Sequence, residues 1–170
     1  MPRSFSPGKA VSSASIIAAL GYTPLATTDL LRSYLDTTVT YNADDTLGDT
    51  ALSVTVAAGG KYAISLMVQS TAAKKALLLD FAGTATFTDF KGTWEGLNSD
   101  NVRDFAFVTA AGTDFNPGAM DGAFSSLYTF TGSCTVNAGG TFLLRGCQNA
   151  SDASDTTILA GSTLTLTKMN

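Results

Sequence analysis

The chain has 170 residues, enough for one domain with a hydrophobic core and a short appendage. Its 10 basic and 14 acidic residues give a formal charge of -4, so no broad cationic surface is available and nucleic acid is not an expected partner. Histidine is absent, which removes the usual general base at neutral pH and the commonest zinc ligand. We therefore expect no catalytic site, no bound metal and no cofactor.

Residues 1–12, MPRSFSPGKAVS, are small and basic and contain Pro2, Pro7 and Gly8. This composition predicts an extended segment that serves as an attachment peptide. Residues 10–20 are apolar enough to suggest a signal peptide, but serines interrupt them, and no apolar run approaches the ~20 residues needed to cross a bilayer. We expect no membrane insertion.

Residues 13–36 predict two short helices. The first has Ser13 or Ser15 as its N-cap and ends at Gly21, and the second begins at Thr28. Helices this short are unstable alone, so their apolar residues must pack against something. One interpretation is that they cover an end of the following domain, and the other is that copies from neighbouring chains form a neck. The neck residues would be Ile16, Ile17, Leu20, Tyr22, Leu25, Leu31 and Leu35.

Residues 37–170 predict an all-β domain. The chain is rich in Thr, and its one Glu is Glu95, a composition that favours strands over helices. Eight to ten short strands separated by Gly, Asn and Asp turns indicate a sandwich or barrel. The expected strands are 37–42, 51–57, 61–70, 76–81, 84–88, 105–110, 125–132, 134–136, 141–148 and 163–168. The runs 76–79 and 141–145 are apolar on both faces, which indicates that a second partner covers them.

Residues 56–62 and 136–142 share the pattern V-x-A-G-G-x-aromatic. We interpret them as equivalent corners of a two-sheet sandwich in which the glycines supply positive φ angles. Pairing Val136 with Thr141 across this turn would leave Cys134 and Cys147 four residues out of step, ~13 Å apart. This predicts two packed free thiols.

Two stretches resemble known proteins. Residues 17–25, IAALGYTPL, resemble the A-L-G-Y-T-P element of fibre proteins of tailed bacteriophages. Residues 139–152 and 159–166 resemble the end of small phage virion domains with a jelly roll of the tumour-necrosis-factor/C1q (TNF/C1q-like) type.

The resemblance implies a homotrimeric protein of the virion surface, made in the host cytoplasm. Its jelly rolls would pack about a threefold axis, and its N-terminal segment would dock on other virion proteins. The implied trimer interface comprises Phe142, Leu143, Leu144, Arg145 and Cys147. Buried there, Arg145 would need a partner such as Asp152 or Asp155 of an adjacent copy, the alternative being a solvated strand-end arginine. The short segment before the A-L-G-Y-T-P motif suits a head fibre, a collar or tail-fibre tip, or a capsid decoration subunit.

Two stretches are candidates for contact with a host surface glycan, because an aromatic ring among amide and carboxylate side chains can hold a sugar. The residues are Trp94, Asn98, Asp100, Phe115 and Asn116. The competing interpretation is that Trp94 and Phe90 fill the end of the sandwich. The close carboxylate groupings, 44/45, 100/104 and 152/155, lie in Asn-, Gly- and Ser-rich stretches where Asp typically caps turns, so neither glycosidase chemistry nor calcium binding is expected.

Overall fold

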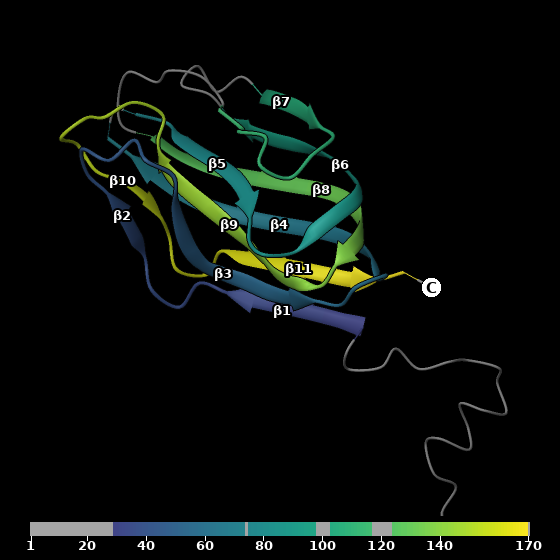
Figure 1. Ribbon diagram of the computed structural model, residues 1–170. Helices are drawn as coiled ribbons and strands as arrows, with labels where there is room; N and C mark the ends of the chain where they lie inside the picture. The colour runs from purple at the N-terminus through teal and green to yellow at the C-terminus, as the bar shows by residue number, and fades with distance from the viewer. Residues whose placement is uncertain (1–28, 74, 98–102, 117–123, 170) are drawn as a thin grey trace, which may run out of the picture.

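The protein folds into two antiparallel β-sheets that pack face to face (Figure 1). The computed structural model describes residues 29–73, 75–97, 103–116 and 124–169. The strands are β1 (Leu30–Tyr34), β2 (Val39–Tyr41), β3 (Gly48–Val56), β4 (Lys61–Ala72), β5 (Leu77–Ala82), β6 (Thr86–Leu97), β7 (Arg103–Val108), β8 (Phe124–Ala138), β9 (Gly140–Gln148), β10 (Thr156–Ile158) and β11 (Thr163–Lys168). The expected all-β class is confirmed, and the arrangement is consistent with a β-sandwich.

The two sheets differ in size. The larger sheet has the order β1-β11-β4-β8-β6-β7, with β10 bridging β2 and β4 beside it, and the smaller sheet has the order β3-β9-β5. Strands from the two ends of the chain pair in a nested series, β1 with β11, β2 with β10, β3 with β9 and β4 with β8. The domain is therefore an antiparallel ribbon folded over on itself. Of the strands in the middle of the chain, β5 and β7 lie at the edges of their sheets, and β6 lies between β8 and β7.

The two V-x-A-G-G segments are the corners where the chain passes from one sheet to the other. The first joins β3 to β4 and the second joins β8 to β9, so each crosses between the sheets. The corners touch each other, because the Gly59 N–H donates to the Val136 carbonyl at 2.8 Å and the Val136 N–H donates to the Gly60 carbonyl at 2.8 Å. The expectation of equivalent sandwich corners is confirmed, although only Gly59 among the four corner glycines has a positive φ, of 73°.

The space between the sheets is filled by aromatic rings. Phe81 of β5 lies at the centre, with its ring centroid 4.8 Å from Phe142, 4.9 Å from Phe130 and 5.1 Å from Trp94. These contacts join β5 and β9 of the smaller sheet to β6 and β8 of the larger sheet. Such a ring pair contributes about 0.5–1.5 kcal/mol beyond the burial of its area, so the cluster is a major source of adhesion between the layers.

A pair of glycines makes room for one of these rings. Gly92 of β6 and Gly132 of β8 are direct cross-strand partners. A Cβ atom at either position would lie within 2.7 Å of the Phe130 ring. The absence of side chains at this cross-strand pair therefore allows the Phe130 ring to lie flat against its own sheet.

The structure corrects several expectations. The helix expected from Thr28 is replaced in its described part by strand β1, which pairs with β11, so the sheet begins before the expected boundary at residue 37. The strands expected at 125–132 and 134–136 form one strand, β8, and β10 was not anticipated. The attachment peptide and the first helix lie outside the described residues. Within the described ranges, no helix has the length and apolar character required to cross a membrane.

We predict that Phe142→Ala lowers the free energy of unfolding by about 3–5 kcal/mol, because it leaves a cavity at a fully buried position in the aromatic cluster. Urea titration followed by the emission of Trp94, the one tryptophan in the chain, measures the change. The control is Thr55→Ala at an exposed position of β3, which should change stability by less than ~0.5 kcal/mol. Equal effects of the two substitutions would contradict the central role of the cluster.

Candidate functional site

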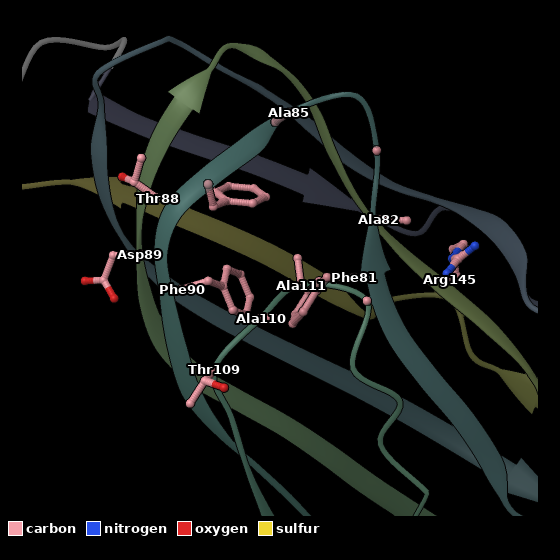
Figure 2. A pocket seen from close by; sticks show the side chains of 13 residues that line it. Phe81, Ala82, Ala85, Thr88, Asp89, Phe90, Thr109, Ala110, Ala111 and Arg145 are labelled. Atoms are coloured by element: carbon pink, nitrogen blue, oxygen red, sulfur yellow. The ribbon is translucent and has the colours of Figure 1, made fainter.

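An open cleft of about 500 Å³ lies between the edges of the two sheets (Figure 2). The end of β5 forms one side, the first half of β6 forms the other, and the segment 109–112 after β7 lies between them. Phe81 and Phe90 point into this space, whereas Thr88 and Asp89 point away from it. The lining is thus aromatic on the inside and polar at the outer rim.

One end of the cleft carries a charged pair. Arg145 of β9 lies opposite Asp80 of β5 in the smaller sheet. Its Nε donates to Asp80 Oδ1 at 2.8 Å, and its Nη2 donates to Oδ2, so the guanidinium holds both carboxylate oxygens. The hydrogen bond to Asp80 raises the pKa of Arg145, and the nearby charges of Asp80, Asp49 and Asp114 raise it further. Asp80 is only 1% exposed, so Arg145 neutralises a buried carboxylate.

Arg145 already has a partner within the chain. This partner is Asp80, so Arg145 does not need Asp152 or Asp155 of an adjacent copy to be neutralised, and a contact with them across a trimer stays a prediction. Sequence reasoning missed this pair because Asp80 and Arg145 are 65 residues apart and meet only through the register of β5 with β9.

The other residues of the expected interface divide between the two faces of β9. Phe142 and Leu144 point into the core, and both are 0% exposed, as is Cys147. Leu143 remains half-buried on the outer face of the smaller sheet, together with Arg145. Only these last two side chains are accessible to a neighbouring chain, and their role in a trimer remains a prediction.

The aromatic residues proposed to hold a sugar are part of the core. Trp94 is 0% exposed and stacks on Phe115, with ring centroids 5.2 Å apart and an interplanar angle of 4°. The interpretation that Trp94 and Phe90 fill the sandwich is therefore confirmed, and neither Trp94 nor Phe115 can stack on an external ligand. Asn116 is exposed and accepts a hydrogen bond from Asn149 at 3.2 Å, whereas Asn98 and Asp100 lie outside the described residues.

The described neck residues belong to the sandwich. Leu35 is 2% exposed and sits in the core, and Leu31 is half-buried against it from β1. Within one chain they contribute to the core as part of strand β1 and the residue that follows it, not as helices that cover an end of the domain. Ile16, Ile17, Leu20, Tyr22 and Leu25 lie outside the described residues.

Two of the close aspartates, Asp44 and Asp152, cap turns, whereas Asp104 lies within strand β7. Asp44 Oδ1 accepts the N–H of Thr46 at 3.0 Å, and Asp152 Oδ1 accepts the N–H of Ser154 at 2.8 Å. The fully buried Gln148 links the two turns, because its Oε1 accepts the N–H of both aspartates. In the described part of the chain, no group of three or more Cys, Asp or Glu side chains is arranged to hold a metal ion.

Exposed aromatic side chains lie at both edges of the larger sheet, at positions that sequence reasoning did not single out. Phe105 and Phe107 of β7 are 63% and 77% exposed and lie with their ring centroids 6.1 Å apart on the outer face of the larger sheet. Tyr34 of β1, at the opposite edge of that sheet, is 54% exposed. The strand expected at 105–110 is observed as β7 at Arg103–Val108, but which of its faces is buried depends on the pairing with β6.

Comparison with known proteins yields no relative. The chain matches no protein-family model, and no curated protein is similar to it. Its function must therefore be inferred from its own residues.

Both cysteines are free and buried, as expected, but for a different reason. Val136 does not pair with Thr141, since Val136 pairs with Phe87 in the larger sheet and Thr141 with Thr55 in the smaller sheet. The two thiols thus lie in different sheets. Burial, the largest cause in each case, raises the pKa of Cys134 and of Cys147 to about 11.

We predict that the native thiols do not react with Ellman's reagent at pH 8 and that both react in urea. Unfolded thiols have a pKa of about 8.5, so above that pH they ionise in the unfolded state but not in the folded one. The contribution of the two thiols to the free energy of unfolding is therefore complete below pH 8.5 and is lost as the pH rises toward 11. Urea titrations between pH 8 and 9, where unfolded tyrosines with a pKa of about 10 stay largely protonated, measure this loss. A Cys134→Ala/Cys147→Ala variant should show a flatter profile. Rapid reaction of the native thiols would contradict their burial.

Proposed function

We propose that this chain is a non-enzymatic structural subunit of a bacteriophage particle, in which homotrimers of a jelly-roll domain project from the surface as a head fibre or a tail-fibre tip. The proposal takes the phage setting from the A-L-G-Y-T-P element and the C-terminal stretch that resembles TNF/C1q-like virion domains. The proposal that copies of the chain assemble rests on the exposed residues of the outer face of the larger sheet.

The nested strand pairing supports the jelly roll. A jelly roll is a double-sheet fold of two Greek keys, and pairing β1, β2, β3 and β4 with β11, β10, β9 and β8 follows such a rolled ribbon. The middle strands depart from a regular form, because β6 pairs with β8 in the larger sheet rather than with β5 in the smaller one.

The outer face of the larger sheet supports self-assembly. Cross-strand register places two lines of side chains across six strands, each ending at an exposed phenylalanine of β7. These lines are Tyr34–Thr163–Met67–Thr129–Glu95–Phe105 and Arg32–Thr165–Ser65–Thr131–Thr93–Phe107. Within these two lines, the middle is formed by short hydroxyl side chains and Met67. The charged members are Arg32 and Glu95, and Glu95 pairs with Arg103 of β7 at 3.6 Å. Exposed aromatic side chains at both edges of a largely hydroxyl-lined face are typical of a surface that packs against a partner.

A ring of copies can use both edges of this face. In cyclic symmetry, a surface at one edge of a subunit meets a different surface of the next subunit, and the ring closes without leaving an edge free. The β7 edge with Phe105 and Phe107 would then meet the next copy near Tyr34. The number of copies, three, comes from the family resemblance.

An alternative is that the protein is a decoration or cement subunit that stabilises the capsid. The same outer face and the same trimer would serve in that case, but the protein would be distributed over the head and would not contact the host.

We predict that the purified protein has a mass about three times the 17.5 kDa of one chain and that Phe107→Asp yields a folded monomer, because it places a charge in the proposed interface. Light scattering coupled to size exclusion measures the mass. Leu143→Asp, on the outer face of the smaller sheet, is the matched control and should remain trimeric. A monomeric wild type would contradict the trimer, and dissociation by Leu143→Asp alone would place the interface on β9.

We predict that gold-labelled antibodies against the protein bind at fibres or the tail tip in electron micrographs of the particles, and that excess protein inhibits phage adsorption to cells. A label spread over the head, with unchanged adsorption and particles that burst at lower temperature when the protein is missing, would support the decoration role. Absence of label from intact particles would contradict both.

A further inference from the structure

The smaller sheet ends earlier than the larger one. The larger sheet continues beyond β8 through β6 and β7, whereas β5 is the last strand of the smaller sheet. Part of the place beside β5 is taken by Phe115, whose N–H donates to the Leu79 carbonyl at 2.7 Å and whose carbonyl accepts the Leu79 N–H at 3.1 Å. This bridge shows that the outer edge of β5 can form hydrogen bonds of the antiparallel type.

The same edge continues into the cleft. Alternate residues of a strand direct their backbone groups to the same side, so the N–H and C=O of Phe81 point to the side on which Leu79 meets Phe115, away from β9. Phe81, Ala82 and Gly83 line the cleft. The backbone of Phe81 therefore lies next in line after the Leu79–Phe115 bridge.

The opposite wall is also a strand edge with one neighbour. β6 pairs with β8 from Thr86 onward, but its pairing with β7 begins only at Gly92, opposite Val108. In residues 86–91, the side of β6 that faces away from β8 is therefore not paired with β7, and it lies beside the cleft. Edges of this kind are sites where an additional strand can pair.

Small residues keep the cleft accessible. Its sides and mouth are formed by Ala82, Gly83, Ala85, Ala110, Ala111 and Gly112. Its inner surface is aromatic, with Phe87 half-buried beside Phe90. An extended peptide beside β5 would alternate, with one side chain directed inward at the phenylalanines and the next directed outward near Arg145.

The charges around the cleft favour a basic peptide. Arg145 is surrounded by Asp49, Asp80 and Asp114. At the other rim, Lys91 and Asp89 neutralise each other at 3.1 Å. Three carboxylates around one guanidinium leave an excess of negative charge on the side that outward-facing residues of an added strand would meet.

We propose that the cleft between β5 and β6 accepts an extended segment of a different protein, which adds as a strand to the free edge of β5 at Phe81, places an apolar side chain against Phe87 and Phe90, and carries a basic residue on its outward face. The proposal rests on the proposed function only in naming the donor as another protein of the particle.

Titration of the full-length protein with the peptide acetyl-Lys-Thr-Val-Thr-Val-Lys-amide, followed by NMR, tests the inference. We expect saturable shifts of the Phe81, Ala82 and Gly83 amide signals and slower hydrogen exchange of the Phe81 amide. The matched peptide with N-methyl groups on one backbone edge keeps the side chains but cannot pair, and it should bind at least ~10-fold more weakly.

Two tryptophan substitutions locate the binding. Ala110→Trp fills the mouth of the cleft at an exposed position and should abolish the peptide shifts, whereas Ala153→Trp, exposed on the loop after β9, should leave them unchanged. Both variants should retain the wild-type thermal midpoint and the wild-type mass, so a failed titration is distinguishable from a failed trimer.

Three results would overturn the inference. The first is the absence of saturable shifts at these amides with millimolar peptide. The second is equal binding of the N-methylated peptide, which would show side-chain capture without strand addition. The third is evidence for a different occupant. Loss of the oligomer in Ala110→Trp would assign the cleft to a second copy of this chain. Shifts produced by neutral bacterial oligosaccharides but not by the peptide would assign it to a sugar.

Discussion

The stacking of aromatic rings around Phe81 is the interaction on which the sandwich depends. Phe81 is the point where rings from β5, β6, β8 and β9 meet, so it joins the three-stranded sheet to the larger one. Phe142 from β9 and Trp94 from β6 are both fully buried against it. The same cluster explains why Trp94 cannot serve as a recognition residue, since its ring is enclosed between Phe81 and Phe115.

The unequal size of the two sheets creates both surfaces proposed to bind partners. Because β6 and β7 extend the larger sheet, Phe105 and Phe107 are presented on its outer face without cover from the same chain. On the inner side, the same extension leaves β5 as a strand edge that, among the described residues, Phe115 partly occupies. One face suits another copy of a flat sheet, and the other suits a single extended segment. The two surfaces are separate, so the proposed partner segment could occupy the cleft without displacing the proposed trimer contact.

The ion pair between Asp80 and Arg145 connects the core to this edge. Asp80 is buried on the outer face of the smaller sheet, next in sequence to Phe81 of the aromatic cluster, and its charge is paired with the guanidinium of Arg145 from the neighbouring strand. A buried carboxylate without that partner would be costly, so the pair fixes the register of β5 against β9. It also supplies the charged rim of the cleft, which links the stability of the edge to its proposed selectivity for a basic segment.

The sequence by itself determined the all-β class, most strands, the sheet-crossing corners and the free thiols, because composition, alternation and glycine spacing are local signals. The tertiary structure decided which face of each strand is buried. It placed Trp94 and Phe115 in the core, left Phe105 and Phe107 outside, and paired Arg145 with Asp80. It also turned the segment around Leu31 into a strand, because hydrogen bonding to β11 outweighs a weak local helix propensity. These outcomes depend on register between residues far apart in the chain, which no local pattern encodes.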